Sequence, residues 1–352
     1  MHQYSTPIRI WLFIGIVMVF VQILLGGITR LTGSGLSITE WKVIIGAIPP
    51  VNKTEWNEAF DQYKQFPQYE KINADMSLSE FKWIFFWEYL HRNWARLIGV
   101  VFLLPFIWFL IRKKIDRKLF PKLMIVFVLG ALQGLVGWIM VKSGLIDKPW
   151  VDHYRLTIHF LLALLVLGYL QWLFLETETR IGDWGLRIRE KKIIPVFWIL
   201  SAVILLQLIY GGFMAGTHAG YLYHSWPMMN GKIIPESLSH NFSLQNITSD
   251  QTHIHFIHRW LAAMVAAFCF IFYWRSRKSE IQSIRKGSFA LIAIVVLQFT
   301  LGVLTLIFSP VGKVDVVLGV CHQGGAVLLL CTVVYLAFHL FSKNSHSEFS
   351  AT

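Results

Sequence analysis

Eight apolar blocks limit how this chain of 352 residues folds. A helix needs roughly 20 mostly apolar residues to cross a bilayer. Blocks of about that length lie near residues 10–29, 90–111, 121–141, 155–175, 194–214, 254–274, 288–308 and 316–341. A soluble domain does not distribute its apolar residues in this way. The sequence therefore predicts an all-α integral membrane protein with eight transmembrane helices in a lipid bilayer.

The charge distribution predicts the orientation of the chain, whose net charge is +12. If the N-terminus is cytoplasmic, the cytoplasmic segments hold 18 basic and 7 acidic residues, and the remaining positions hold 14 and 13. Cytoplasmic loops of membrane proteins are enriched in Lys and Arg. The charge thus reflects topology rather than a nucleic-acid surface. Because no mitochondrial-type presequence is visible, we expect a multi-pass protein of the bacterial cell (inner) membrane with both termini cytoplasmic.

Four matches in the same order indicate an internal duplication. The matched pairs are Gln22 to Gly27 with Gln207 to Gly212, His91-Arg92 with His258-Arg259, Gln133 to Gly137 with Gln298 to Gly302, and His159 with His322. Each half has an even number of spans, so the two halves share one orientation and are related by a pseudo-twofold axis along the membrane normal. We expect two four-helix bundles, residues 1–180 and 181–352, each with a site between facing helices.

The first outer loop, roughly residues 30–85, carries its own helical signals. Trp56, Phe60 and Tyr63 recur at helical spacing, which predicts a surface helix with an aromatic face at the membrane interface. Ser77 with Glu80 predicts a capping box at the start of the helix that leads into the second span. The loop is interpreted either as a lid over the outer mouth or as a set of membrane anchors.

Four of the thirteen histidines recur at matched positions of the repeat, namely His91, His159, His258 and His322. Ionisable groups at membrane depth are costly and usually functional. Zinc sites generally need further cysteine or carboxylate ligands nearby. Two histidines from two facing helices instead suit the axial positions of a haem iron. The pairs His91 with His159 and His258 with His322 therefore predict one haem site in each half. We expect most of the other outer histidines to be solvated, namely His153, His218, His224, His240 and His253.

Cationic and acidic residues accompany these histidines. Arg92 and Arg259 each follow a histidine of the repeat and are candidates to bind haem propionates, with Arg96 one turn below Arg92. Glu88 precedes His91 by three residues, on the same helical face. The second half has His255 in that place. A carboxylate beside a haem pocket is suited to accept a proton, so this difference predicts that the first half reacts and the second half relays electrons.

The motifs identify a family. They are Gly26 to Ser37 with Glu40-Trp41, Glu88 to Arg92, Gln133 to Leu145, Ala215-Gly216, Ala219-Gly220, Trp226 to Met228, His258-Arg259 and Cys321 to Gln323. Together they resemble haem A synthase over nearly the whole chain. The resemblance implies an oxidoreductase that converts haem O to haem A, by oxidising a ring methyl to a formyl group for terminal oxidases.

The resemblance also implies roles for individual residues. In that family the N-terminal half binds the substrate haem and the C-terminal half keeps a haem B cofactor. His91 and His159 would then flank haem O, His258 and His322 would ligate the iron of haem B, and Glu88 would be the catalytic carboxylate. The partners implied are an electron acceptor or donor system and, as a hypothesis, a haem O synthase that delivers the substrate. The sequence is also compatible with a homo-oligomer.

Two departures from the family pattern concern the outer loops. Some members have a cysteine pair in the first outer loop, and this chain has none there. In the second half, His224 and Ser225 precede Trp226-Pro227 where Asn-Thr is expected. A thiol step is therefore not part of the expected mechanism. With histidine on both faces of the substrate iron, we instead expect electron removal through the porphyrin, proton transfer toward Glu88 and addition of water.

Two other classes of protein share some of these features. A di-haem membrane cytochrome that transfers electrons from quinol would also carry duplicated histidine pairs. A transporter would also be built from duplicated bundles. The difference between Glu88 and His255 favours the enzyme, and formation of haem A in cells that supply haem O separates it from the cytochrome.

Overall fold

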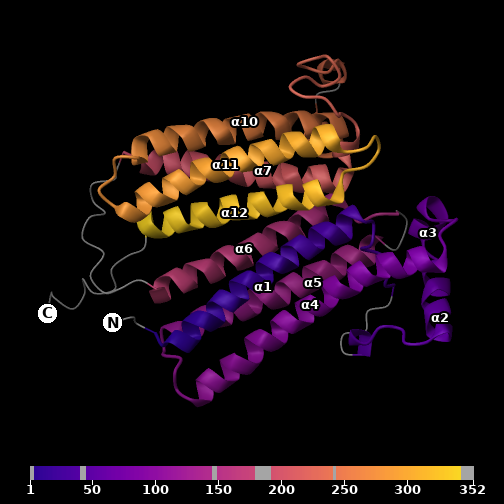
Figure 1. Cartoon of the computed structure of the whole chain (residues 1–352), viewed down its shortest axis with the longest axis horizontal. Helices are drawn as coiled ribbons and strands as arrows, with labels where there is room; N and C mark the ends of the chain where they lie inside the picture. The colour runs from indigo at the N-terminus through magenta and orange to yellow at the C-terminus, as the bar shows by residue number, and fades with distance from the viewer. Residues whose placement is uncertain (1–3, 40–44, 145–148, 179–191, 241–242, 342–352) are drawn as a thin grey trace.

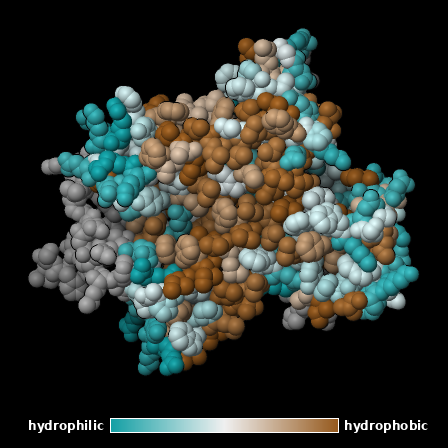
Figure 2. All heavy atoms as spheres, viewed as in Figure 1, coloured by the Kyte–Doolittle hydropathy of each residue, from teal (hydrophilic) through white to brown (hydrophobic). Residues whose placement is uncertain are grey.

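The computed structural model describes residues 4–39, 45–144, 149–178, 192–240 and 243–341, and within these ranges all regular elements are helices. Eight are long and apolar enough to cross a membrane, as predicted. They are α1 (Thr6–Leu31), α4 (Leu78–Ile111), α5 (Leu119–Gly144), α6 (His153–Glu178), α7 (Ile194–Thr217), α10 (Gln251–Ser276), α11 (Gln282–Phe308) and α12 (Val316–Phe341). Figure 2 shows the resulting apolar belt, with hydrophilic residues at its two ends.

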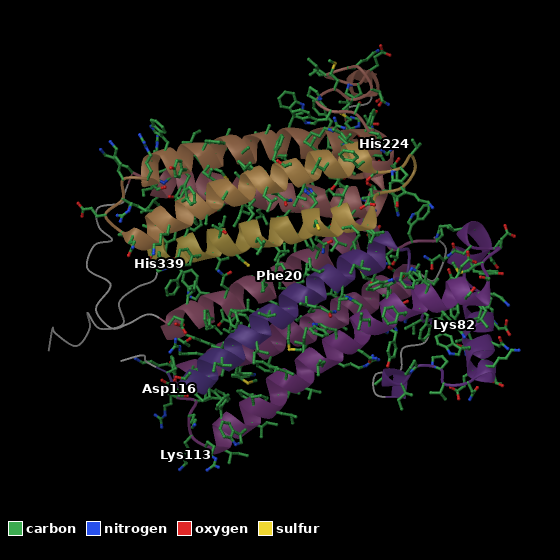
Figure 3. All side chains as sticks on the ribbon, viewed as in Figure 1. Phe20, Lys82, Lys113, Asp116, His224 and His339 are labelled. Atoms are coloured by element: carbon green, nitrogen blue, oxygen red, sulfur yellow. The ribbon has the colours of Figure 1, made fainter. Side chains whose placement is uncertain are left out.

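Within the described residues, six short helices connect the spans. They are the 3₁₀ turns η1 (Ile45–Ala47) and η3 (Ala219–Tyr221) and the α-helices α2 (Lys53–Tyr63), α3 (Pro67–Ile72), α8 (Ser237–His240) and α9 (Leu244–Ser249). Helices α2 and α3 lie at one end of the molecule, called the outer end here after the predicted orientation (Figure 1). Lys82 and His224 lie toward this end, whereas Lys113, Asp116 and His339 lie toward the opposite end (Figure 3).

Most contacts between the long helices join helices of the same half of the chain. Helix α1 packs against α4 and α6, and α5 packs against α6; in the second half α7 packs against α10, and α11 packs against α10 and α12. Helices α6 and α12 lie side by side in the middle of the molecule and, with α1 and α7, join the halves (Figure 1). The predicted boundary between the halves, near residue 180, lies outside the described residues.

Helix α4 is longer than a bilayer requires. Its first turns pack with α2 and α3, and these three elements are called the outer domain here. The predicted capping box is confirmed, because Ser77 and Glu80 bond each other's backbone amides. Phe60 and Tyr63 of α2 stack on Phe81 of α4 with ring centroids 4.9 and 5.3 Å apart. The aromatic face of α2 is therefore buried against protein, and the prediction that it lies at the membrane interface is wrong.

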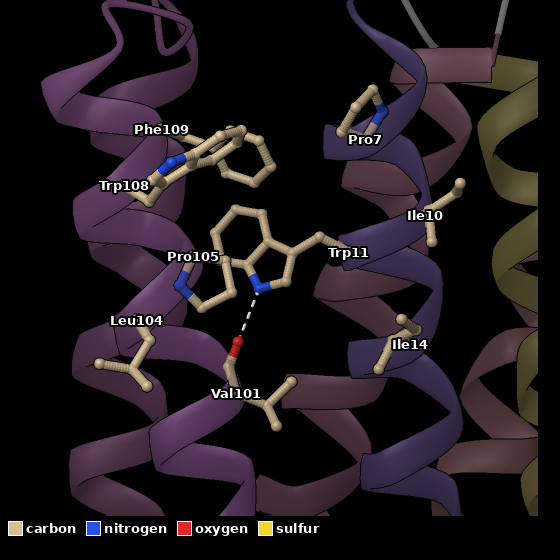
Figure 4. Close-up of a pocket in the computed structure, with 9 residues that line it drawn as sticks. All are labelled: Pro7, Ile10, Trp11, Ile14, Val101, Leu104, Pro105, Trp108 and Phe109. Atoms are coloured by element: carbon tan, nitrogen blue, oxygen red, sulfur yellow. Dashed lines mark hydrogen bonds between the residues drawn. The ribbon is translucent and has the colours of Figure 1, made fainter.

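Pro105 leaves one carbonyl of α4 without its usual helical partner. Proline has no N–H to donate to the carbonyl of Val101, four residues earlier. The indole Nε1 of Trp11 on α1 donates to that carbonyl instead, at 2.9 Å (Figure 4). The bond lies in an apolar groove of about 700 Å³ between α1 and α4, whose lining has no ionisable side chain. The groove therefore serves helix packing rather than chemistry.

The replacement of Trp11 by phenylalanine tests this bond. Removal of the indole N–H leaves a buried carbonyl unsatisfied, so the Trp11→Phe variant should lose about 1–2 kcal/mol of stability in mixed-micelle unfolding. In a Pro105→Ala background the helix supplies its own N–H, and the hydrogen-bond part of the loss should disappear. Equal losses in both backgrounds would show that only packing changed.

Candidate functional site

The four histidines of the repeat occupy equivalent places in the fold. Each lies on the second helix of a pair of consecutive spans: His91 on α4, His159 on α6, His258 on α10 and His322 on α12. The first helix of each pair presents a glutamine and, four residues later, a glycine. These residues are Gln22 and Gly26 on α1, Gln133 and Gly137 on α5, Gln207 and Gly211 on α7, and Gln298 and Gly302 on α11.

Each glycine provides the surface on which an imidazole lies. A Cβ added to Gly137 would lie 2.8 Å from Cε1 of His159, and one added to Gly302 would lie 2.9 Å from Cε1 of His322. At Gly26 the corresponding distance to His91 is 3.2 Å. A real Cβ atom does not approach another atom as closely as it would at Gly137 or Gly302. The rings of His159 and His322 can therefore lie where they do only because these two residues are glycines. The repeated glycines thus set how closely each histidine approaches the neighbouring helix.

Three of the four glutamines lie within hydrogen-bond distance of the histidine on the neighbouring helix. Gln22 Nε2 donates to the backbone carbonyl of His91 at 3.1 Å and lies 3.2 Å from Nδ1 of its ring. Gln133 repeats the backbone contact with His159 at 3.1 Å. Gln207 Nε2 lies 3.3 Å from Nε2 of His258. These contacts restrict rotation of the rings, which is the usual task of groups that surround a metal-binding histidine.

The second pair of histidines faces across its bundle. The ring centroids of His258 and His322 are 6.5 Å apart, and the ring planes are inclined by 79°. This spacing leaves room for one metal ion with a bond of about 2 Å to a nitrogen of each ring. The structure thus places His258 and His322 opposite each other, as the sequence predicts. In the first half, His91 lies against Gly26 of α1 and His159 lies against Gly137 of α5.

Several buried polar atoms around these rings have no hydrogen-bond partner in the described chain. They include Nδ1 of His159, His258 and His322 and the side-chain oxygens of Gln22, Gln133, Gln207 and Gln298. Buried polar atoms are rarely left unsatisfied, so such a concentration points to a ligand. Within the described residues no three His, Cys, Asp or Glu side chains form a metal-binding group. Two histidines per site therefore fit an axially ligated haem better than a zinc ion.

The carboxylate of Glu88, in the first half, is buried and accepts several hydrogen bonds. Its side chain is only 2% exposed. It accepts hydrogen bonds from Ser37 Oγ at 2.7 Å, from the Ile38 amide at 2.8 Å and from Arg92 Nη2 at 2.5 Å. Arg92 also donates to the Ile38 carbonyl at 2.9 Å. The ion pair compensates for the burial of the carboxylate, and the segment after α1 is thereby fastened to α4.

Among the described residues, the corresponding place in the second half has no ion pair. His255 is 2% exposed, and its Nδ1 lies 3.1 Å from the Ala219 carbonyl. Arg259 donates from Nη1 to the Met228 carbonyl at 3.4 Å, while its Nε and Nη2 are buried without a partner in the described chain. A guanidinium with free, buried N–H groups suits a carboxylate ligand. Arg259 therefore fits a propionate, whereas Arg92 is engaged by Glu88, and Arg96 donates to Asn93 Oδ1 at 2.7 Å.

The outer domain holds the segment that covers Glu88. Gln68 donates from Nε2 to the Gly33 carbonyl at 2.9 Å and accepts a bond from the Tyr63 hydroxyl at 3.1 Å. Burial raises the pKa of Tyr63 to about 12, so its hydroxyl remains a donor at physiological pH. These hydrogen bonds and the aromatic cluster fasten α2, α3 and the segment after α1 to the outer end of α4. Nothing in the spacing of Gln68 in the sequence indicated this role.

Two further histidines differ from expectation. His253 is buried rather than solvated, because it lies in the first turn of α10 and its Nδ1 is 2.7 Å from the N-cap residue Asp250. His153 lies where α6 meets α7 and α9, with its Nε2 3.0 Å from the Thr248 carbonyl. Both belong to the packing of the outer end rather than to either histidine pair.

Substitution of the glycines by alanine gives a graded test of the imidazole positions. In Gly302→Ala the new methyl group would displace the ring of His322, so the purified protein should hold at least tenfold less haem, measured by Soret absorbance per polypeptide. In Gly211→Ala the added Cβ would lie 3.6 Å from His258, an ordinary contact, and haem content should stay near the wild-type level. Equal haem loss in both variants would contradict the assignment.

Comparisons with known proteins agree over almost the full length of the chain. A family model described as cytochrome oxidase assembly protein, COX15-CtaA, matches residues 9–334. A protein of Flavobacterium psychrophilum named Heme A synthase is 43% identical over 350 residues, which cover 96% of this chain and 99% of the relative. Proteins with the same name from Flavobacterium johnsoniae and Nitrosospira multiformis are 39% and 40% identical, and the alignments cover 97% and 95% of this chain and 100% and 93% of the relatives.

Proposed function

Since the chain belongs to the COX15-CtaA family of cytochrome oxidase assembly proteins, we propose that it is a haem A synthase, which oxidises a ring methyl of haem O to a formyl group. The observation that carries the proposal is the difference between two otherwise matched sites. The first half has a buried carboxylate, Glu88, one helical turn from His91, and the second half has His255 in that place. A site for chemistry needs a proton acceptor, whereas a site that only holds a haem does not.

The second half is the proposed site of the haem B cofactor. His258 and His322 would ligate its iron, and Arg259 would pair with a propionate through its unpartnered N–H groups. Bound there, haem B supplies a carrier for single electrons between the substrate site and an external electron acceptor or donor system. The protein's contribution is to fix the imidazole of His322 against Gly302 and to hold that of His258 beside Gln207.

The first half is the proposed site of haem O, between His91 and His159. With an imidazole on each face of the iron, no coordination position is open for dioxygen, so the new oxygen atom comes from water. Each oxidation removes two electrons and two protons from the substrate carbon and its water. The first gives an alcohol, and the second gives a geminal diol that loses water to form the aldehyde. Glu88 is the group that accepts a proton from the methyl carbon.

Arg92 and the segment after α1 position Glu88 for this role. The carboxylate is held by three donors from two elements, so its orientation is fixed before substrate binds. In this proposal Arg92 is primarily the counter-ion of Glu88, and a substrate propionate has to compete with that ion pair. The corresponding Arg259 has no such competitor, which suits permanent retention of a cofactor.

The setting of the enzyme follows from its chemistry and charge. We place it in the bacterial inner membrane with both termini cytoplasmic, in accord with the positive charge of the segments at that side. Haem O is too apolar to be free in water, so it arrives within the bilayer, and its source is a haem O synthase in the same membrane.

Replacement of Glu88 by glutamine tests the proposed proton acceptor. Glu88→Gln keeps the size of the side chain but removes its basicity, so conversion of haem O should fall about 100-fold or more. The measurement is the haem A content of extracts from cells that co-express the variant with a haem O synthase. Glu80→Gln, at an exposed glutamate of the same helix, is the matched control and should convert normally. Normal conversion by the Glu88 variant would exclude the proposed role.

Separate replacement of the two histidine pairs tests the assignment of the halves. His258→Ala and His322→Ala should abolish the resident haem B of the purified protein, whereas His91→Ala and His159→Ala should retain it and lose conversion. Absorbance spectra and extracted haems report both results. If the wild-type protein holds two haems and makes no haem A, it is an electron-carrying di-haem cytochrome and the proposed function fails.

A further inference from the structure

The segment that follows the first transmembrane helix of each half folds over the second transmembrane helix of that half. In the first half the segment after α1 reaches α4, where Arg92 donates to the Ile38 carbonyl at 2.9 Å. In the second half the segment after α7 reaches α10, where Arg259 donates to the Met228 carbonyl at 3.4 Å. The two matched arginines are therefore covered by two matched segments, which differ in the groups that they bring to the site.

The second of these segments, residues 222–232, is called the outer loop here, and it contacts both α10 and α11. The ring centroid of Tyr223 lies 5.5 Å from that of His255, which is one helical turn before the arginine of α10. The ring centroid of Trp226 lies 6.2 Å from that of Phe299, which directly follows the glutamine of the α11 motif. The outer loop therefore connects these two helices close to the second histidine pair.

His224 lies between these two contacts in the chain, and one of its ring nitrogens is already engaged. Its Nε2 lies 3.1 Å from the Tyr221 carbonyl. Because a carbonyl oxygen only accepts hydrogen bonds, Nε2 carries a hydrogen, and this bond fixes the orientation of the imidazole. The other nitrogen, Nδ1, is buried and has no hydrogen-bond partner among the described residues. A buried, oriented nitrogen of this kind indicates a ligand that is not part of the chain.

Ser225 fixes the outer loop beside Arg259. Its Oγ donates at 2.8 Å to the Met228 carbonyl, the same oxygen to which Arg259 Nη1 donates. The Asn230 amide donates to Ser225 Oγ at 2.9 Å. The residue after His224 thus shares an acceptor with Arg259, whose Nε and Nη2 are buried without a partner in the described chain. Unpartnered nitrogens of His224 and Arg259 are thereby brought to one part of the site.

The charges of the two halves differ in a way that indicates the ligand. In the first half a carboxylate of the chain, Glu88, joins the covering segment to Arg92. In the second half, among the described residues, no carboxylate bonds either Arg259 or His224. The nitrogens there suit a carboxylate, and a haem carries two of them as propionates. The ligand thus supplies in the second half the charge that the chain supplies in the first.

We propose that His224, together with Arg259, binds the propionates of the haem that the second half holds between His258 and His322. This inference rests on the cofactor site of the proposed function. Nδ1 and the carboxyl group share one proton, either as imidazolium with carboxylate or as imidazole with carboxylic acid, so a hydrogen bond forms in both cases. Asparagine, expected here from the family pattern, also offers an N–H to a carboxylate. The outer loop is then fastened to the cofactor, which helps the protein to retain it.

Haem release from the holoprotein tests the role of His224. The protein is purified with its resident haem from cells without a haem O synthase, and transfer of the haem to excess apomyoglobin is followed by Soret absorbance. His224→Ala should release haem about tenfold faster or more, because it loses a charge-assisted hydrogen bond. His224→Asn places an N–H near the position of Nδ1 and should stay within about threefold of the wild type. His224→Gln places its amide near the position of Nε2 and should release haem as the alanine variant does.

Lys232→Gln is the matched control. It removes a positive charge from the same loop, where the ammonium group pairs with Glu236, and it should release haem at the wild-type rate. Resonance Raman spectra of the holoproteins give a second measurement: the propionate bending band should move in His224→Ala and stay in Lys232→Gln. Unchanged absorbance of the bis-histidine haem shows that each variant is folded.

Three results would overturn the assignment of His224. They are wild-type release of haem by His224→Ala, equal release by His224→Asn and His224→Gln, and a propionate band that does not move in His224→Ala. Failure of the proposed function has a different signature, because the wild-type protein itself would then form no haem A. A di-haem cytochrome would still retain its second haem through His224, so the two tests are independent.

Discussion

The contact between an imidazole and a glycine of the neighbouring helix is the interaction on which both sites depend. A histidine ring at membrane depth needs a partner, and a larger residue in place of Gly137 or Gly302 would push the ring out of position. The glycine allows the helices to approach, and the glutamine one turn earlier limits how the ring turns. Helix spacing, ring orientation and ligand geometry are therefore set by one short motif used four times.

The same motif also joins the two halves. On α1 and α7 a second glycine follows the first and faces the other half: Gly27 receives Gln323 of α12, and Gly212 receives Thr157 of α6. Gln323 donates from Nε2 to the Ile23 carbonyl at 2.7 Å, and Arg30 donates to the Ala215 carbonyl across the interface between α1 and α7. The first glycine of each adjacent pair thus contacts a histidine of its own half, and the second contacts a residue of the other half.

Function arises where the two halves stop matching. The first half pairs Glu88 with Arg92, whereas among the described residues His255 in the second half has no ion pair and lies beside the Ala219 carbonyl. A matched pair of haem sites would only bind two equivalent haems. In the proposed function, the carboxylate gives one of the two sites its chemistry. This difference leaves the four histidines unchanged, so in that proposal a duplicated scaffold holds a substrate and a cofactor.

The sequence by itself determined the eight spans, the repeat and the four histidines, because hydrophobic length and matched spacing are properties of the chain. It also singled out Glu88 against His255. Only the tertiary structure decided that Arg92 is bound by Glu88 and that the aromatic face of α2 is buried on α4. These depend on contacts between residues distant in the chain, such as Ser37 with Glu88, and local patterns do not encode which surfaces meet.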